Sequence, residues 1–187
     1  MIRTIYTLLI MFATLLIIDI FVGGYSCPTR NTNVVNIGNA FSNITASIYE
    51  YQDKYRALPG DINRDGKIDG AFDSTKNNDE SRLFWLHLRK AGLFDGDPND
   101  QQQPTSKFGL IGVSSCIDTC IGKEELVSRL YIGFSGIPGN IAIMFESRVD
   151  DGKANSGSIQ SHRTVSDMVI PVEVYAENGI YNLYFSL

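Results

Sequence analysis

The sequence lacks the features on which most catalytic and nucleic-acid-binding sites are built. It has no cluster of Lys and Arg, and its net charge is −5, so it offers no basic surface that could follow a phosphate backbone. It contains no nucleophile elbow, no phosphate-binding loop and no paired metal-binding histidines. We therefore expect a protein that is not an enzyme and that does not bind nucleic acid.

Cysteine is also scarce, with three residues in the chain. Cys116 and Cys120 are separated by a spacing that suits a short disulfide loop in an oxidising compartment, with two free thiols as the alternative. Zinc would need two further ligands, and His87 and His162 lie too far apart in the sequence to form a typical ligand pair. We predict the disulfide, with Cys27 left unpaired.

Charge is nearly absent from the first part of the chain. The apolar run from Ile5 to Val22 contains one charged residue, Asp19, and as a helix it is about as long as a membrane is thick. We interpret this run as a retained transmembrane anchor, a cleaved secretory signal or a lipoprotein signal whose modified residue is Cys27. In all three cases the remainder of the chain lies outside the cytoplasm, because Arg3, the only cation among residues 1–29, precedes the run.

The chain divides into an anchor or signal segment at residues 1–24, a polar break at residues 25–32 and one folded domain at residues 33–187. Pro28 interrupts any continuous helix through the break. The domain opens with apolar residues at alternating steps of three and four, which predict one helix with a buried stripe. They are Val34, Ile37, Phe41, Ile44, Ile48, Tyr51 and Tyr55. Pro59-Gly60 ends this helix, and we expect it to pack on a sheet rather than in a coiled coil.

Short β-rich segments dominate the second half of the chain. Before them, residues 79–91 predict a short helix closed by Gly92. The predicted strands are residues 108–113, 129–134, 169–175 and 180–186. Residues 138–149 between them predict a further helix, with a strand as the alternative, and Asn178-Gly179 suits a hairpin turn between the last two strands. A long helix followed by strands indicates an α+β fold with an antiparallel sheet.

The polar segment after Gly60 matches the first nine positions of a calcium loop. Oxygen ligands stand at positions one, three and five, a glycine at six, a backbone carbonyl at seven and an acid at nine. The corresponding residues are Asp61, Asn63, Asp65, Gly66, Lys67 and Asp69. The bidentate acid of position twelve is replaced by Phe72, and Asp73 comes one place late. We predict a structural Ca²⁺ site, with a solvated turn held by its own Asp and Asn side chains as the alternative.

Three segments in this order resemble the type IV pilin and type II secretion pseudopilin family. They are Tyr55-Arg56-Ala57-Leu58-Pro59-Gly60-Asp61, then Trp85-x-His87-Leu88-x-x-Ala91-Gly92-Leu93, and then Asp150-Asp151-Gly152 followed by Gly157-Ser158-Ile159. The resemblance implies a pilin-like fold, in which a long N-terminal helix packs on a C-terminal antiparallel sheet. We expect His87 to lie on a helix face and complete the packing of Trp85. Asp150-Asp151-Gly152 is interpreted as an acidic turn, with a second cation site as the alternative.

The resemblance also implies a function. Members of this family are structural subunits of a type II secretion pseudopilus or a type IV pilus, so the expected partners are other pilin or pseudopilin subunits and the bacterial inner membrane. The domain would face the periplasm or the cell exterior. The usual prepilin peptidase motif, a Gly followed by Phe-Thr-Leu-Ile-Glu, is absent, and the nearest text is Ile5-Tyr6-Thr7-Leu8-Leu9-Ile10. The alternative is an anchored or secreted binding module on a pilin-like scaffold that does not polymerise.

Overall fold

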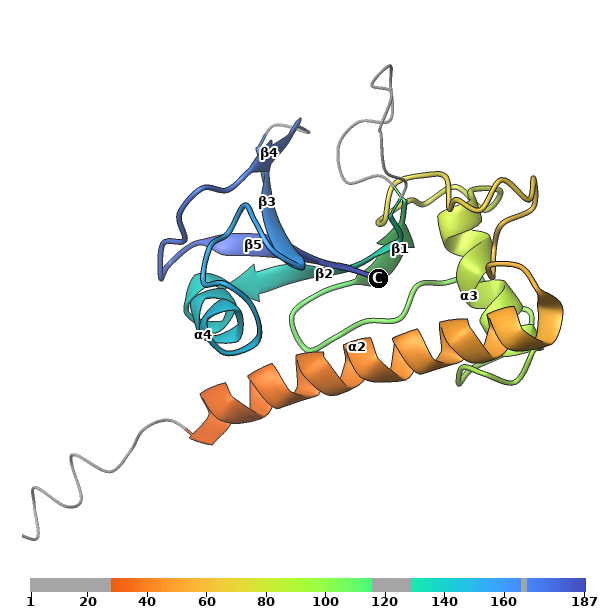
Figure 1. Ribbon diagram of the computed structural model, residues 1–187, viewed down its shortest axis with the longest axis horizontal. Helices are drawn as coiled ribbons and strands as arrows, with labels where there is room; N and C mark the ends of the chain where they lie inside the picture. Colours follow the sequence, from red (N-terminus) through yellow and green to blue (C-terminus); the bar gives the residue numbers. More distant parts are fainter. Residues whose placement is uncertain (1–27, 116–128, 166–167) are drawn as a thin grey trace, which may run out of the picture.

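The computed structural model describes residues 28–115, 129–165 and 168–187 (Figure 1). Cys27, Cys116 and Cys120 lie outside these ranges, so the predicted disulfide stays a prediction. The apolar run from Ile5 to Val22 lies outside them as well.

Helix α2 (Pro28–Tyr55) opens the described part of the chain. The helix begins at Pro28, inside the predicted polar break at residues 25–32. Proline is tolerated in the first helical turn, where its missing N–H would have no partner within the helix. The chain leaves the helix at Arg56, which has a left-handed φ of 55°. The predicted stripe is largely correct, since Val34, Ile37, Ile44 and Ile48 are buried.

Five strands form one antiparallel sheet in the order β1-β2-β5-β3-β4. Their bounds are β1 (Ile111–Ser114), β2 (Tyr131–Pro138), β3 (Ile159–Val165), β4 (Met168–Pro171) and β5 (Ile180–Ser186). The α+β class and the antiparallel sheet are therefore confirmed. β3 was not predicted, because its central residues from Gln160 to Thr164 are all polar and give no alternating apolar pattern.

The predicted hairpin between the last two strands is wrong. β5 pairs with β2 and β3 rather than with β4, because its buried residues suit the middle of the sheet. The turn at residues 176–179 forms, with the Gly179 N–H donating to the Ala176 carbonyl at 2.9 Å. It packs on the start of α4 (Gly139–Val149), where the Gly139 N–H donates to the Gly179 carbonyl at 2.8 Å.

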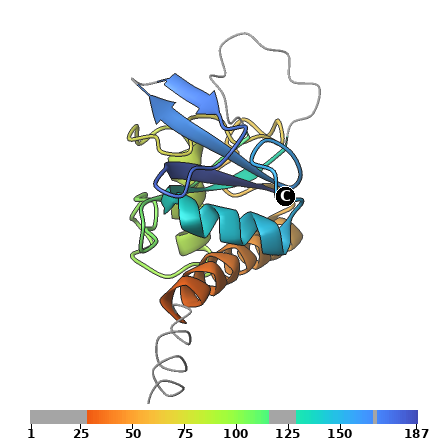
Figure 2. The same cartoon turned by 90° about the vertical axis from the view of Figure 1, so that its left-hand side faces the viewer.

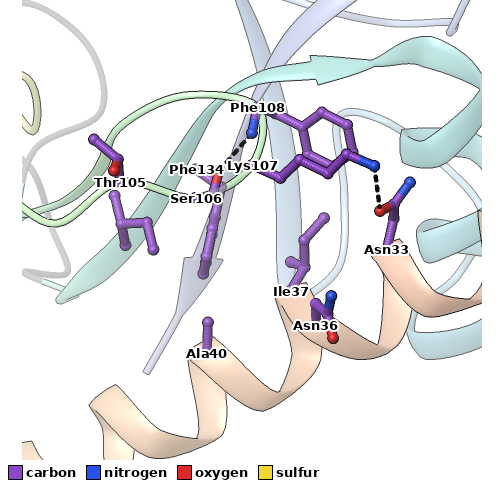
Figure 3. A pocket seen from close by; sticks show the side chains of 10 residues that line it. Asn33, Asn36, Ile37, Ala40, Thr105, Ser106, Lys107, Phe108 and Phe134 are labelled. Atoms are coloured by element: carbon purple, nitrogen blue, oxygen red, sulfur yellow. Dashed lines mark hydrogen bonds between the residues drawn. The ribbon is translucent and has the colours of Figure 1, made fainter.

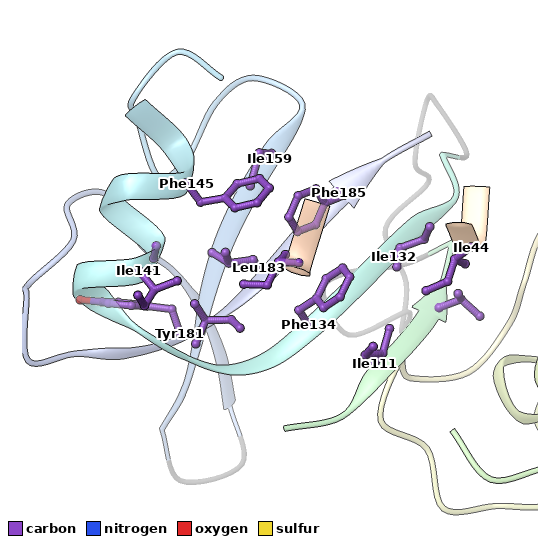
Figure 4. Close-up of a cluster of buried hydrophobic side chains, with 14 of the residues drawn as sticks. Ile44, Ile111, Ile132, Phe134, Ile141, Phe145, Ile159, Tyr181, Leu183 and Phe185 are labelled. Carbon is purple, nitrogen blue, oxygen red and sulfur yellow. The ribbon is translucent and has the colours of Figure 1, made fainter. Parts of the chain in front are cut away.

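Helices α2 and α4 cover the same face of the sheet (Figures 1 and 2). The ring of Phe185 in β5 contacts Phe41 of α2 at a centroid distance of 5.1 Å and Phe145 of α4 at 5.2 Å. Phe134 of β2 completes this aromatic cluster at 5.2 Å from Phe185, and Figure 4 shows the three rings of Phe134, Phe145 and Phe185 among aliphatic side chains. The core thus lies between the two helices and the sheet.

Helix α3 (Glu80–Lys90) packs beside β1 at the other end of the molecule (Figure 1). Both shorter helices form where the sequence predicts them. Phe84, Trp85 and Leu88 of α3 are buried, and Gly92 follows the helix with a φ of +74°, as expected of a helix-ending glycine.

Candidate functional site

The turn after α2 is packed tightly under α3. Gly60 has a φ of +88°, and a Cβ at this position would lie 2.6 Å from the Glu80 carbonyl oxygen and 2.7 Å from the Phe84 nitrogen. The Gly60 N–H donates to Nδ1 of His87 at 2.9 Å. The structure therefore brings Gly60 of the first family-like segment against His87 of the second. Only glycine fits in this contact.

His87, which the sequence predicts to complete the packing of Trp85, contacts the turn after α2 and the helix α2 itself. Its Nδ1 is a hydrogen-bond acceptor, and its ring stacks on Tyr51 of α2 at 6.4 Å. Burial, followed by the nearby charge of Lys90, lowers the pKa of His87 below its ordinary value. The neutral imidazole thus joins α2, the turn and α3. Tyr55, also of the first segment, packs against Tyr51 with tilted rings whose centroids are 4.5 Å apart, and it remains 45% exposed.

The loop at residues 61–69 is wrapped around its own polar side chains. Asp61 accepts hydrogen bonds from the N–H groups of Arg64 and Gly66, the latter at 3.0 Å. Asn63 Oδ1 accepts from the Asp65 N–H at 3.0 Å, and Asp65 Oδ1 accepts from the Lys67 N–H at 2.9 Å. This is the pattern of an Asx-turn loop. It is also the side-chain arrangement on which a calcium loop is built, so the calcium prediction stays open.

A carboxylate that the sequence analysis missed closes this loop. Glu80, in the first turn of α3, is 5% exposed. Its Oε1 accepts from the N–H of Ile62 at 3.0 Å and of Asn63 at 3.4 Å, and its Oε2 accepts from the N–H of Asp69 at 2.9 Å. The two ends of the loop are thereby tied to α3. The only sequence signal for this role is an acid at a helix N-terminus, which most often faces solvent.

The acids proposed as calcium ligands differ in their surroundings. Asp69 has a raised pKa because of burial and then because of the nearby carboxylates of Glu80 and Asp65. Asp73 is exposed, whereas Phe72, at position twelve of the loop, is 7% exposed and packs edge-on against Tyr184 at 5.1 Å. The chain at position twelve therefore turns into the core, which explains why an apolar residue stands there.

A second acidic group lies at the end of α4. Ligand oxygens of Glu146, Asp150 and Asp151 lie within 4.8 Å of one another, and within the described ranges this is the group of carboxylate, imidazole or thiol side chains that can hold a metal ion. The pKa of Glu146 is raised to about 7, chiefly by burial; a hydrogen bond from Tyr175 acts to lower it, and the charges of Asp150 and Asp151 act to raise it. Gly152 follows with a φ of +80°. The acidic turn expected from the sequence is thus present, with one more carboxylate beneath it.

A cavity of about 160 Å³ lies between α2 and the segment at residues 105–108 (Figure 3). Ile37, Phe108 and Phe134 form apolar parts of its wall. At its edge, Lys107 Nζ donates to Asn33 Oδ1 at 3.3 Å. Its lining has no acid, histidine or cysteine, and Lys107 is its only titratable side chain.

No family model, curated protein or solved structure matches the chain. The resemblance to pilins therefore stays a prediction. Within the described ranges no helix is both long and apolar enough to cross a membrane, and the expected anchor lies outside them.

Proposed function

We propose that the chain is a non-catalytic structural subunit of a type II secretion pseudopilus or a type IV pilus. In this proposal the apolar run from Ile5 to Val22 anchors it in a bacterial inner membrane, and the domain faces the periplasm or the cell exterior. The observation that carries the proposal is the character of α2, the first helix of the described domain, which has no charged residue between Arg30 and Glu50.

The inward face of α2 packs against the rest of the domain. Its buried residues Val34, Ile37, Ile44 and Ile48 belong to the same core as the sheet and α4. Ser47 adds a polar contact, because its hydroxyl lies 2.8 Å from the Leu93 carbonyl after α3. α2 is therefore an integral part of the folded domain. In this proposal, movement of the anchor segment during assembly moves the domain with it.

The outward face of α2 is suited to contact other subunits. Its exposed residues between 32 and 49 are all uncharged: Thr32, Val35, Asn36, Asn39, Ser42, Asn43, Ala46 and Tyr49. The solvent face of a helix in a globular domain usually carries charged side chains, whereas the buried centre of a protein interface is depleted of them. Val35 is 51% and Tyr49 60% exposed, so packing of α2 against the helices of neighbouring copies would bury apolar surface at little electrostatic cost.

Mass spectrometry of the amino terminus of the membrane-extracted protein tests the proposal. A trimmed and N-methylated end supports the pilin route. An intact Met1, or cleavage after Gly24 or Ser26, contradicts it and favours the anchored or secreted binding module. The missing prepilin peptidase motif makes this the decisive measurement.

Crosslinking in the membrane tests the outward face of α2 separately. A photoreactive amino acid at Asn39 should capture a second copy or another pilin-like subunit. The same residue placed at Glu177, which is exposed on the turn before β5, should not. Equal capture at both positions would contradict assembly through α2.

We also propose that Ca²⁺ binds the loop at residues 61–69 as a structural clip. The oxygen-rich spacing of Asp61, Asn63, Asp65 and Asp69 supports this, and burial together with the nearby charges of Glu80 and Asp65 raises the pKa of Asp69. Because Glu80 already ties the loop to α3, we expect only a small increase in melting temperature at millimolar Ca²⁺. An Asp65→Ala variant should lose it; an unchanged increase in this variant would contradict the clip.

A further inference from the structure

The end of α4 places three carboxylates where a carboxylate is electrostatically unfavourable. Glu146 lies in the last turn, Asp150 is the C-cap, and Asp151 follows it. The unpaired carbonyl groups of a helix C-terminus carry partial negative charge, which favours cations and disfavours acids. Three acids at this position therefore create a strongly negative site that needs compensation.

Glu146 provides the independent sign of a missing partner. It is 1% exposed, and its Oε1 accepts a hydrogen bond from the Tyr175 hydroxyl at 2.8 Å. Ser161 in turn bonds to the Tyr175 oxygen, which fixes the tyrosine in place. The other oxygen, Oε2, is buried and has no hydrogen-bond partner among the described residues. An unsatisfied buried carboxylate oxygen is costly, and this one belongs to the group formed with Asp150 and Asp151.

The two aspartates are held in place by their own loop. Asp150 Oδ2 accepts from the Ile159 N–H at 2.7 Å, which ties the C-cap to β3. Asp151 accepts from the Lys153 N–H at 2.9 Å and from the Ser156 hydroxyl at 2.6 Å. Gly157 has a φ of +82°, and a Cβ there would lie 2.2 Å from Asp150 Oδ2. The carboxylates are thus positioned before any ligand arrives.

We propose that Glu146, Asp150 and Asp151 bind one divalent cation of the calcium type, which joins the end of α4 to the turn before β3. Ca²⁺ binds oxygen ligands at about 2.3–2.6 Å, so two ligands on opposite sides of one ion lie about 5 Å apart. The three ligand oxygens lie within 4.8 Å of one another, which fits this span. The ligands are hard oxygens without imidazole or thiolate, a set that favours Ca²⁺ and similar hard cations over zinc. Water completes the coordination on the exposed side of Asp151.

The site is independent of pilus assembly and of the loop at residues 61–69. Equilibrium dialysis of the full-length chain in non-ionic detergent with radioactive calcium tests it, in an Asp61→Asn/Asp65→Asn background that weakens the other loop. We expect saturable binding of one ion per chain. Glu146→Gln, which preserves the shape of the side chain, should weaken binding at least tenfold. Asp151→Asn, at an exposed position that does not affect the core, should weaken it as well.

The matched control is Glu177→Gln, which removes one exposed carboxylate elsewhere and should leave the affinity unchanged. Melting temperature measured in CaCl₂ against NaCl of equal ionic strength should rise in the background protein and not in its Glu146→Gln variant. The proposal is overturned by no saturable binding in the background protein, or by binding that survives both Glu146→Gln and Asp151→Asn. Either result would mean that Glu146 is neutralised by a proton alone.

Discussion

Two acidic turns of this protein each contain one buried glutamate, and the two glutamates are satisfied in opposite ways. Glu80 accepts three backbone N–H groups from the loop at residues 61–69. Glu146 accepts one tyrosine hydroxyl and has a free buried oxygen among the described residues. The difference shows that a buried carboxylate can be stabilised by the chain itself when backbone amides converge on it.

The helix dipoles increase the contrast. Glu80 lies in the first turn of α3, where the positive end of the dipole favours a carboxylate, whereas Glu146 lies in the last turn of α4, where the negative end disfavours it. The loop at residues 61–69 is therefore held to Glu80 by hydrogen bonds, whereas Glu146 keeps a buried oxygen without a hydrogen-bond partner among the described residues. The predictions below test this contrast.

The largest effect is expected from Gly60→Ala, which tests how tightly the turn between α2 and the loop at residues 61–69 packs against α3. The new Cβ would collide with backbone atoms of α3 and would hold a left-handed φ, so the free energy of unfolding should fall by about 3 kcal/mol or more. Urea denaturation measures it. Gly66→Ala is the matched control, because Gly66 has a φ of +80° and no atoms near its Cβ position; it should cost about 1 kcal/mol. Equal losses would show that the contact with α3 is unimportant.

Glu80→Gln should destabilise the protein by about 2–3 kcal/mol, because a carbamoyl group keeps only one acceptor oxygen and leaves a buried N–H unpaired. The reference variant is Asp73→Asn, which neutralises an exposed acid nearby and should change stability by less than about 0.5 kcal/mol. Urea denaturation at neutral pH compares the two. If Glu80→Gln lowered the free energy of unfolding as little as Asp73→Asn, the hydrogen bonds of Glu80 would not be important for stability.

Glu146→Gln is expected to act in the opposite direction. In calcium-free buffer it should leave stability unchanged or raise it by up to about 1 kcal/mol, because it removes a buried charge and gives Asp150 and Asp151 an N–H donor. The same denaturation experiment with a chelator present measures it. A loss as large as that of Glu80→Gln would mean that the two glutamates are equally well satisfied, and the contrast would fail.

The smallest effect concerns pH and His87. Its folded pKa is lowered, so the unfolded chain binds the proton more readily, and the free energy of unfolding should decrease as pH falls from the ordinary value of 6.5 towards the folded pKa. Above 6.5 the contribution is fully present. Lys90 contributes to the lowered pKa, and the stacked Tyr51 is neutral in this range because its own pKa is raised.

The matched variant is His87→Asn, whose side-chain oxygen can accept the Gly60 N–H but does not titrate. Its stability should decline less steeply than that of the wild type between pH 7 and pH 5 in urea denaturation. Identical slopes would show that His87 does not contribute to the pH dependence.

The helices and most strands could be predicted from local pattern, because apolar spacing, Gly92 and the proline before α4 act over a few residues. β3 could not, because its polar side chains carry no alternating apolar signal. The strand order could not be predicted either, because the apolar residues of β5 indicate that it is buried but not which strands pair with it.

The acidic loops were visible in the sequence, but their key glutamates were not. Glu80 and Glu146 each stand on an amphipathic helix, where an acid is expected to face solvent. Their partners lie 11 residues away at Asp69 and 29 residues away at Tyr175. Only the tertiary fold shows that these two acids are buried.

Phe72 connects the first acidic loop to the sheet. Its carbonyl oxygen lies 1.9 Å from the Cβ position of Gly112, and its ring lies 2.8 Å from that of Gly133. Phe72 therefore packs closely against β1 and β2, at two positions where only glycine leaves room for it. A force applied to the loop by a neighbouring molecule would be transmitted to the edge of the sheet formed by β1 and β2.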